Sequence, residues 1–268
     1  MEIIFAILVL GFLGLFFGIG LAIASKKLAV HIDEKVEKVF HLLPGANCGA
    51  CGNPGCFGFA ESLVSSKAVV DACRVSNEAS REEIARILGA SLEKKIRRTA
   101  VLHCQGGAKV KERFIYSGIN DCLAANLVAG GSKACVFGCL GFGTCAKACP
   151  FGAISMSEEK LPVIDQNKCR ACNKCVLACP KKLIALAPIT GVVTVCCNSH
   201  DFGKEVKMAC SVGCIGCKLC EKACKFSALT VIDNLAVIDY HKCTSCGECV
   251  KVCPTHAIKM PVEAQKFT

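Results

Sequence analysis

Cysteine dominates this chain, and most of its cysteines fall in four compact blocks. The sequence has 25 cysteines among 268 residues, and residues 169–180, CRACNKCVLACP, show the block pattern C-x2-C-x2-C-x3-C-P. Aromatic residues make up only 6% of the chain, so this usage indicates a covalent or metal framework rather than a packed aromatic core. Thiols spaced so closely bind a metal, form disulfides or carry out redox chemistry at the sulfur itself.

The N-terminal segment indicates the compartment, which bears on that choice. Residues 3–24 carry no charge and two lysines follow at 26 and 27, which is long enough for one membrane-spanning helix of about 20 residues. A secretory signal is the alternative, because AIAS at 22–25 resembles a cleavage site. However, Glu2 stands where a basic run is usual, and the apolar stretch exceeds the roughly 7–15 residues of a signal.

We therefore expect a single-pass anchor in the inner (cytoplasmic) membrane. Because the lysines follow the span, the N-terminus should lie outside and the cluster domains on the cytoplasmic side. A reducing cytoplasm disfavours disulfides, which leaves metal as the main interpretation of the cysteines.

The four blocks form one two-block unit that occurs twice. Their cysteines are Cys135, Cys139, Cys145 and Cys149; Cys169, Cys172, Cys175 and Cys179; Cys214, Cys217, Cys220 and Cys224; and Cys243, Cys246, Cys249 and Cys253. The second pair of blocks follows the first at an offset of 74 or 75 positions, and the intervening segments 153–165 and 228–239 each predict a short β-hairpin. Asp233 and Asn234 fit a two-residue turn. The first block is stretched, and Lys225 replaces the closing proline of the third.

Each two-block unit resembles the bacterial two-cluster ferredoxin. In that family three cysteines of one block and the last cysteine of the other bind each [4Fe–4S] cube. The resemblance implies four ligand sets: Cys135, Cys139, Cys145 with Cys179; Cys169, Cys172, Cys175 with Cys149; Cys214, Cys217, Cys220 with Cys253; and Cys243, Cys246, Cys249 with Cys224. Zinc is the rival metal, but zinc ribbons use two separated C-x2-C pairs, which fits these blocks poorly.

Upstream, a glycine-rich stretch predicts one more cluster. GANCGACGNPGC at 45–56 contributes three cysteines and a fourth follows, giving the set Cys48, Cys51, Cys56 and Cys73. Four thiolates suit a [2Fe–2S] or a [4Fe–4S] cluster alike. Ser80 and Glu83 predict a capping box that opens a helix, and residues 30–40 predict a short amphipathic helix in a tether near the membrane.

Five cysteines lie outside these motifs and flank the first ferredoxin-like unit on both sides: Cys104, Cys122, Cys196, Cys197 and Cys210. Two interpretations remain open. Free cysteines pack as small apolar residues. Alternatively, a sixth cluster forms from Cys104, Cys122 and Cys210 with either Cys196 or Cys197, of which we take Cys197.

Motifs along the whole chain resemble the B-subunit family of the Rnf membrane complex, called Rsx in some bacteria. The resemblance rests on the uncharged N-terminal helix, the paired units, and LLPGANCGACG at 42–52, HCQGG at 103–107, DCLAA at 121–125 and GCLGFGTC at 138–145. It implies an electron-transfer subunit of an ion-translocating ferredoxin:NAD⁺ oxidoreductase, which takes electrons from soluble ferredoxin. The implied partners are membrane, flavin-carrying and NAD-binding subunits. The sequence has no G-x4-G-K-[ST] phosphate loop, and GCLGFG lies inside a cysteine block, so we expect NAD and flavin on other subunits.

The expected architecture is α+β, with five [4Fe–4S] clusters and a sixth if the remaining cysteines bind one. Its segments are a transmembrane anchor (1–25), a tether (26–45), an N-terminal Fe–S domain (46–97), a connecting segment (98–131), a first two-cluster ferredoxin-like domain (132–188), a second connecting segment (189–211), a second two-cluster domain (212–262) and a tail (263–268). The alternatives are an electron-transfer subunit of another membrane oxidoreductase such as a hydrogenase, a zinc-binding membrane scaffold, and an exported disulfide protein.

The net charge of the chain has to be considered together with the charge of the predicted clusters. The formal net charge is +10, which by itself would suit a nucleic-acid binder. Five oxidised cubes with four thiolates each, at about −2 per cluster, offset it, so no nucleic-acid partner is expected. Basic runs remain at 93–98, at 109–113 and at 181–182. We hypothesise that one of them steers an acidic ferredoxin into contact.

Overall fold

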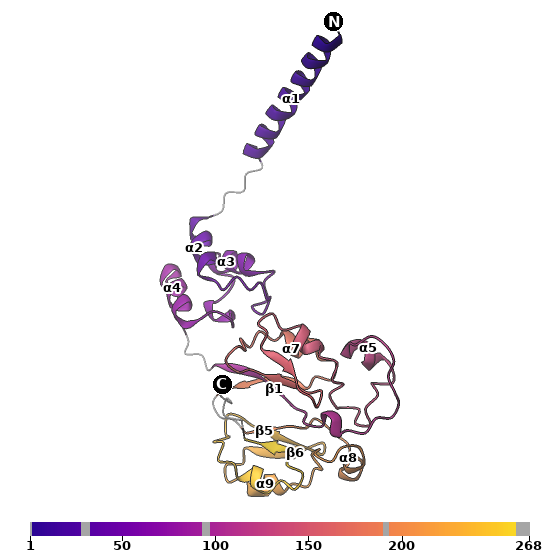
Figure 1. Ribbon diagram of the computed structural model, residues 1–268. Coiled ribbons are helices and arrows are strands. Elements are labelled where there is room, and N and C mark those ends of the chain that lie inside the picture. The colour runs from indigo at the N-terminus through magenta and orange to yellow at the C-terminus, as the bar shows by residue number, and fades with distance from the viewer. Residues whose placement is uncertain (1, 28–32, 93–96, 190–192, 261–268) are drawn as a thin grey trace.

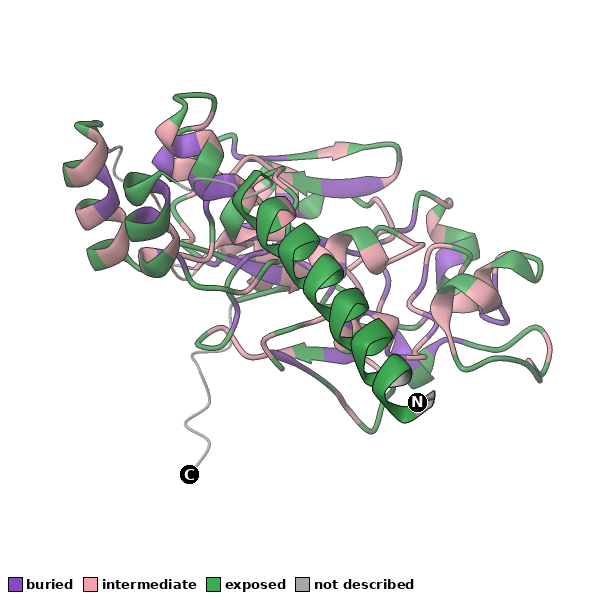
Figure 2. Ribbon diagram, turned by 90° about the horizontal axis from the view of Figure 1, so that it is seen from above, coloured by how far each residue is buried: buried purple, intermediate pink, exposed green. Residues whose placement is uncertain are grey.

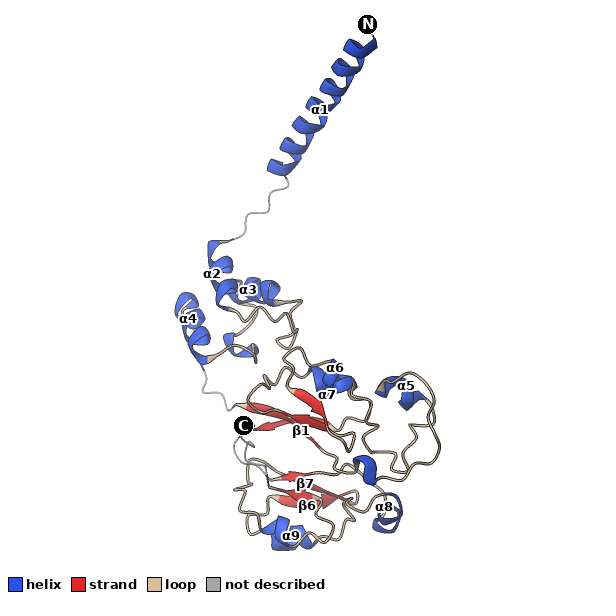
Figure 3. Ribbon diagram, in the orientation of Figure 1, coloured by secondary structure: helices blue, strands red, loops and turns tan. Residues whose placement is uncertain are grey.

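The computed structural model describes residues 2–27, 33–92, 97–189 and 193–260. A long N-terminal helix stands apart from a small helical domain, which is followed by two stacked units that contain the short strands (Figures 1 and 3). The mixed helix and strand content agrees with the expected α+β class.

Helix α1 (Glu2–Lys27) is the apolar segment predicted to span the membrane. Its stretch from Ile3 to Lys27, 25 residues, is the one candidate span among the described residues. The large apolar side chains of α1 are exposed (Figure 2). A helix that is apolar on every side and packs on no other element suits lipid rather than water, so α1 fits a membrane-anchored protein.

The small helical domain contains α2 (Glu34–Leu42), α3 (Cys56–Val64), the 3₁₀ helix η1 (Val70–Ala72) and α4 (Glu78–Leu88). Its core includes Val36 and Val39 from α2, Phe59 from α3 and Ile84 from α4. Residues 34–42 were expected in a tether, and the helix itself is present as predicted. However, the i, i+3 spacing of its two valines places both on the face that packs against the domain, so α2 belongs to the core.

The start of α4 differs from the sequence prediction. Asn77 is the N-cap, and its side-chain oxygen accepts a hydrogen bond from the backbone N–H of Ser80 at 2.7 Å. The capping box predicted from Ser80 and Glu83 is therefore wrong, because the helix begins at Glu78, about one turn earlier. Asparagine caps a helix at least as well as serine.

Each stacked unit contains two antiparallel strand pairs. In the first unit β1 (Arg98–Leu102) pairs with β4 (Ile184–Pro188), and β2 (Ile154–Met156) pairs with β3 (Pro162–Ile164). In the second, β5 (Thr194–Val195) pairs with β8 (Ile258–Lys259), and β6 (Leu229–Ile232) with β7 (Leu235–Ile238). Both predicted hairpins are confirmed, and the Asp233–Asn234 turn has φ values of 46° and 63°, as a type I′ turn requires.

The outer strands change the interpretation of the two connecting segments. Strand β1 lies in the segment 98–131 and β5 in the segment 189–211, and each pairs with the last strand of the unit that follows it. Each connecting segment thus supplies the first strand of its unit and then an insertion before the first cysteine block. The insertions contain η2 (Gly107–Lys109) and α5 (Cys122–Leu127) in the first unit and α8 (Gly203–Ala209) in the second.

The cores of the two units are small and include thiols. Buried cysteines lie beside aliphatic side chains in both cores, namely Cys145, Cys169 and Cys175 in the first unit and Cys214 and Cys220 in the second. Units of this size bury little apolar surface. Metal bound by these thiols would therefore form part of the folded core.

Candidate iron–sulfur centres

The third cysteine of every block lies in the first turn of a short helix. The four helices are α6 (Thr144–Lys147), α7 (Lys174–Ala178), α9 (Leu219–Ala223) and α10 (Glu248–Lys251), which contain Cys145, Cys175, Cys220 and Cys249. A residue in the left-handed region precedes each helix, with φ between 60° and 79°. This residue turns the chain sharply between the preceding cysteine and the helix, so the loop and the first helical turn face the same space.

The last cysteine of every block is also held in one repeated way. Its sulfur accepts a hydrogen bond from the backbone N–H four residues later, at 3.3–3.4 Å, in the pairs Cys149–Ala153, Cys179–Leu183, Cys224–Ala228 and Cys253–Ala257. Hydrogen bonds to sulfur favour the thiolate, the form that binds metal. The same backbone geometry thus presents four thiols as ligands.

In the second unit the structure brings together both predicted ligand sets. Burial raises the pKa of Cys220 to about 12, and the neighbouring thiols of Cys214, Cys217 and Cys253 add to the rise. A cavity of about 20 Å³ is lined by the other set, Cys224, Cys243, Cys246 and Cys249. Thiols with raised pKa values are protonated at neutral pH, so metal binding there would release protons.

In the first unit one predicted set lies together. Burial raises the pKa of Cys175 to about 12, and the neighbouring thiols of Cys169, Cys172 and Cys149, followed by Cys145, add to the rise. Cys175 with the first three of these is the crossed set that the ferredoxin resemblance implies.

The other predicted set of the first unit is not brought together as a whole. A cavity of about 20 Å³ is lined by Cys139, Cys145 and Cys179, and the fourth cysteine on its wall is Cys122. Cys135 lines a different cavity, together with Cys104, Cys197 and Cys210. Compared with the predicted sets, Cys122 and Cys135 have exchanged places.

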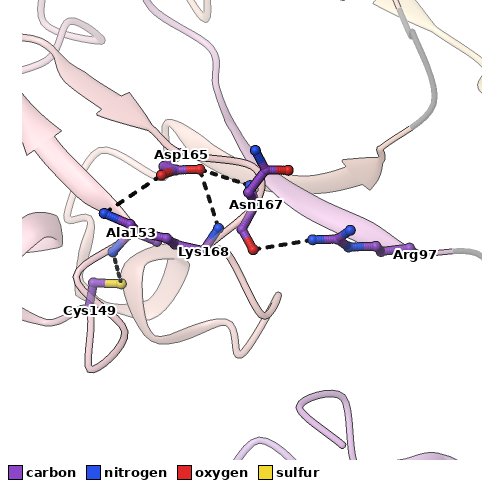
Figure 4. A network of polar contacts seen from close by, with 6 residues as sticks. All are labelled: Arg97, Cys149, Ala153, Asp165, Asn167 and Lys168. Carbon is purple, nitrogen blue, oxygen red and sulfur yellow. Dashed lines mark hydrogen bonds and ion pairs between the residues drawn. The ribbon is translucent and has the colours of Figure 1, made fainter. Parts of the chain in front are cut away.

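A small polar network around Asp165 holds Cys149 (Figure 4), and the backbone of Cys169 joins the same network. The backbone N–H of Asp165 donates to the carbonyl of Ala153 at 2.8 Å, and Ala153 donates in turn to the sulfur of Cys149. The backbone N–H of Cys169 donates to the carbonyl of Asp165 at 2.9 Å. The Asp165 carboxylate accepts hydrogen bonds from the backbone N–H groups of the next two loop residues, 167 and 168.

The four N-terminal cysteines lie on a loop between α2 and α3 and just after η1. The Asn47 side chain accepts a hydrogen bond from the backbone N–H of Cys56 at 2.7 Å, which fixes the loop to the start of α3. Cys51, Cys56 and Cys73 pack at the same core, while Cys48 is a thiol neighbour of Cys172. The predicted N-terminal centre therefore adjoins the Cys169–Cys175 block of the first unit.

The described residues contain no group of three His, Cys, Asp or Glu side chains that could hold a single metal ion. A [4Fe–4S] cube has different geometric requirements, because each of its four thiolates binds a separate iron corner. Thiols arranged around a common cavity, as in Cys224, Cys243, Cys246 and Cys249, suit such a cube better than one tetrahedral ion.

Several residues of the basic runs have structural partners. Arg113 donates to the backbone carbonyls of Ala129, Gly131 and Lys133, and Lys181 donates to that of Gly130 at 2.7 Å. These side chains close the loop between α5 and the first block. Residues 93–96 of the first basic run lie outside the described residues.

Family models match four segments that together contain all twenty predicted ligands. "Putative Fe-S cluster" matches residues 43–75, and "4Fe-4S dicluster domain" matches 134–184. "4Fe-4S binding domain" matches twice, at 214–228 and 236–259. Iron–sulfur domains of the ferredoxin type are thus present in both stacked units, and [4Fe–4S] clusters are their cofactors.

Relatives match along nearly the whole chain. The B subunit of the Na(+)-translocating ferredoxin:NAD(+) oxidoreductase complex of Acetobacterium woodii is 45% identical over 97% of this chain and 78% of its own length. The chain belongs to the Rnf B-subunit family. The proton-translocating counterpart from Clostridium ljungdahlii is 44% identical over 96% of this chain and 92% of its own length. The B subunit of the ion-translocating oxidoreductase complex of Methanosarcina acetivorans is 42% identical over 95% of this chain and 97% of its own length.

Family membership confirms the function predicted from the motifs. The chain is an iron–sulfur electron-transfer subunit of an Rnf-type complex, the ion-translocating ferredoxin:NAD⁺ oxidoreductase. The structure places Cys122, and not Cys135, at the cavity of Cys139, Cys145 and Cys179, and block spacing does not indicate this because it groups Cys135 with its nearest cysteines. The offset of 75 residues between Cys135 and Cys210 was the signal that could have revealed it.

Proposed function

We propose that this chain takes electrons from reduced ferredoxin and relays them to the membrane, flavin-carrying and NAD-binding subunits of the complex. NAD⁺ reduction on those subunits would be coupled to ion translocation, and the direction reverses when NADH is the donor. The names of the relatives support this proposal, since all three are B subunits of ion-translocating complexes and two of the names include ferredoxin and NAD⁺.

The observation that carries the proposal is the close succession of cysteine groups. Cys48 of the N-terminal set neighbours Cys172, and Cys175 of the next set neighbours Cys145 of the one beyond. We assign a [4Fe–4S] cluster to the N-terminal set and two to each ferredoxin-like unit. A bound cube exchanges one electron at a time, and the residues described above hold, bury and hydrogen-bond its thiolates.

The same proposal sets the chain in the membrane. The α1 helix would cross the inner membrane once, with Lys26 and Lys27 at its cytoplasmic end. The N-terminus would then lie outside and both ferredoxin-like units in the cytoplasm, where ferredoxin and NAD⁺ are found.

A basic cavity beside the N-terminal centre supports a docking place for ferredoxin. The cavity has a volume of about 880 Å³ and lies between the helical domain and the first unit, with Cys51, Cys73 and Cys169 on its wall. Five arginines line it as well, Arg74, Arg81, Arg97, Arg98 and Arg170, against two carboxylates, Asp71 and Glu78. Arg81 pairs with Asp71, and the lining keeps an excess of positive charge. An acidic ferredoxin would be drawn to this concentration of positive charge, and the rate of encounter would fall with ionic strength.

The test uses the full chain purified in detergent without oxygen. We expect about 20 irons or more per chain, little zinc, and loss of visible absorbance when reduced ferredoxin is added. Arg74→Glu and Arg170→Glu, two exposed positions at the cavity, should slow this reduction and weaken its salt dependence. Arg86→Glu, an exposed position on α4 away from the cavity, is the matched control.

Two results would contradict the proposal. A well-folded, colourless chain rich in zinc would mean that the cysteines form a scaffold. If dithionite reduced the chain and reduced ferredoxin did not, the clusters would be present but ferredoxin would not be their electron donor.

A further inference from the structure

The outer strands align the insertions of the two units with one another. Leu102 at the end of β1 pairs with Ile184, and Val195 at the end of β5 pairs with Ile258. Ile184 and Ile258 are 74 positions apart, the offset of the repeat, so Leu102 and Val195 occupy equivalent places. Two residues beyond each strand the chain has a cysteine, Cys104 in the first unit and Cys197 in the second.

A second pair of cysteines is equivalent by the same repeat. Cys139 and Cys214 are 75 positions apart, as are Cys145 and Cys220. Cys135 lies four residues before Cys139, and Cys210 lies four residues before Cys214, so these two cysteines are also 75 positions apart. Cys135 is therefore the counterpart of Cys210, which lies outside the third block, and is not a regular member of the first block.

This alignment leaves the first block one ligand short. The residue equivalent to Cys217 is Phe142, 75 positions earlier. Cys122 lines the cavity where that ligand is missing, with Cys139, Cys145 and Cys179.

Local hydrogen bonds hold Cys122 beside the first block. The backbone N–H of Cys122 donates to Oγ1 of Thr144 at 2.8 Å, and this hydroxyl donates to Asp121 at 2.8 Å. Asp121 also caps α5 by accepting from the N–H groups of Leu123 and Ala124. Because Thr144 precedes Cys145, this arrangement sets Cys122 next to the ligands of the first block.

The two equivalent pairs meet at one cavity between the units. Cys104, Cys135, Cys197 and Cys210 line a cavity of about 20 Å³, the same volume as each of the two cavities at the ferredoxin-type sites. A Cβ on Gly106 would lie 3.3 Å from Sγ of Cys210 and 3.9 Å from Sγ of Cys104. One on Gly213 would lie 3.8 Å from Sγ of Cys197. The nearest atoms to these two positions are methyl groups of Val110 and Val206, too close to admit a Cβ, so only glycine fits where the chain passes beside the sulfurs.

Hydrogen bonds from the residues flanking Cys104 hold it against the second unit. Nδ1 of His103 donates to the carbonyl of Val195 at 2.8 Å. Nε2 of Gln105 donates to the carbonyls of Val212 at 3.0 Å and His256 at 2.7 Å. Both neighbours of Cys104 thus bond the second unit, and the cavity wall is assembled from both units.

Three of the sulfurs at this cavity have backbone donors of the kind found at the block cysteines. The N–H groups of Phe137, Ser199 and Val212 donate to the cysteines two residues before them, Cys135, Cys197 and Cys210. Cys139 and Cys172 in the blocks accept from the same relative position. Cys196 differs, because its sulfur donates to the carbonyl of Thr194 at 3.8 Å, as a protonated thiol does.

We propose that Cys104, Cys135, Cys197 and Cys210 hold a further [4Fe–4S] cluster, bridging the two units, and that Cys122 completes the site of Cys139, Cys145 and Cys179. The inference rests on the proposed assignment of [4Fe–4S] clusters to the cysteine blocks. The bridging site adjoins both units, since Cys104 neighbours Cys139 and Cys197 neighbours Cys214. A cluster there would join the two halves of the electron relay.

The first test is the metal content of the full chain, purified in detergent without oxygen. Six cubes give about 24 irons and 24 acid-labile sulfides per chain, and five give about 20 of each. The double variant Cys104→Ala/Cys210→Ala should lower both counts by about four. The control Cys196→Ala, which removes another thiol from the wall of the same cavity, should leave both unchanged.

A second pair of double variants tests the exchange of Cys122 and Cys135. Cys135→Ala/Cys210→Ala and Cys122→Ala/Cys145→Ala each remove two ligands from one site and should each lose about four irons without a three-iron EPR signal. If Cys135 and Cys122 held the places that block spacing suggests, each variant would damage two sites. About eight irons would then be lost, or [3Fe–4S] signals would appear from both sites, and the exchange would be overturned.

The metal content of the unmodified chain tests the bridging cluster even if a variant fails to fold. About 20 irons per chain, or an unchanged count in Cys104→Ala/Cys210→Ala, would overturn the bridging cluster and leave the proposed function intact. Little iron with much zinc would instead refute the iron–sulfur assignment itself.

Discussion

The loop that presents Cys169 should depend on the carboxylate of Asp165. In the network of Figure 4 this carboxylate accepts from the N–H of Asn167 at 2.9 Å and of Lys168 at 3.3 Å. Asp165→Ala removes both bonds and leaves two N–H groups to be satisfied by water. Hydrogen bonds to a charged group contribute about 1.5–3 kcal/mol, but the Asp165 side chain is 33% exposed and the second bond is long. We expect a loss of about 1–2 kcal/mol, which is a five- to thirtyfold change in the opening equilibrium of the loop.

The assay is the rate of iron loss from the full chain, incubated without oxygen in mild denaturant with an iron chelator. When a loop opens and closes faster than the chelator acts, the rate of loss follows the opening equilibrium. Asp165→Ala should therefore accelerate the first phase of bleaching about five- to thirtyfold. Asp165→Asn, which keeps an acceptor oxygen of the same reach, should accelerate it far less.

The second unit supplies a matched comparison. Asp239 occupies the equivalent place, and its carboxylate accepts from the N–H of His241 at 2.9 Å. Asp239→Ala should accelerate iron loss from the second unit by a smaller factor, because one such bond is present there instead of two. Bleaching of Asp165→Ala at the unmodified rate would refute the idea that this network controls the site.

Three further outcomes are expected. Phe59→Ala, at a side chain 1% exposed in the helical domain, should lower the free energy of unfolding of that domain by about 3–5 kcal/mol in a denaturant titration; Phe57→Ala, at a position 38% exposed, should cost much less. Stripping iron with a chelator under anaerobic conditions should abolish the strand signal in far-ultraviolet circular dichroism, since both small cores include thiols; retention of that signal would contradict metal-dependent folding. Lys218→Gly should stabilise the second unit by up to about 1 kcal/mol, because Lys218 has φ of 60°; an unchanged unfolding midpoint would count against strain there.

Local features of the fold were predictable from the sequence. The β6–β7 hairpin follows from apolar alternation on both sides of Asp233 and Asn234, two residues that tolerate positive φ. In three of the four crossed ferredoxin sets the structure also brings the predicted cysteines together. Spacing marks them because the left-handed residue, the short helix and the N–H···S bond of each block all lie within about ten residues of chain. Family membership followed from the motifs for the same reason.

Pairings between distant segments were not predictable in this way. Strand β1 pairs with a segment more than 80 residues away, and β5 is only two residues long, so neither has a local hydrophobic period that marks it. Helix α2 was predicted as a helix, but the burial of Val36 and Val39 depends on α3 and α4. The early start of α4 depends on Asn77, a cap as good as the serine three residues later.

The arrangement of the two units indicates what the bridging cluster would contribute to the structure. Each unit has its own small apolar core, and no described core cluster extends across both. The contacts that join them include single hydrogen bonds, such as those of His103 and Gln105, and each contributes only about 1 kcal/mol. Such bonds alone would let the units shift relative to one another, and a shift would change the separation between their clusters. Four metal–sulfur bonds, two from equivalent positions in each unit, would fix that separation. The bridging cluster would therefore position the relay as well as extend it.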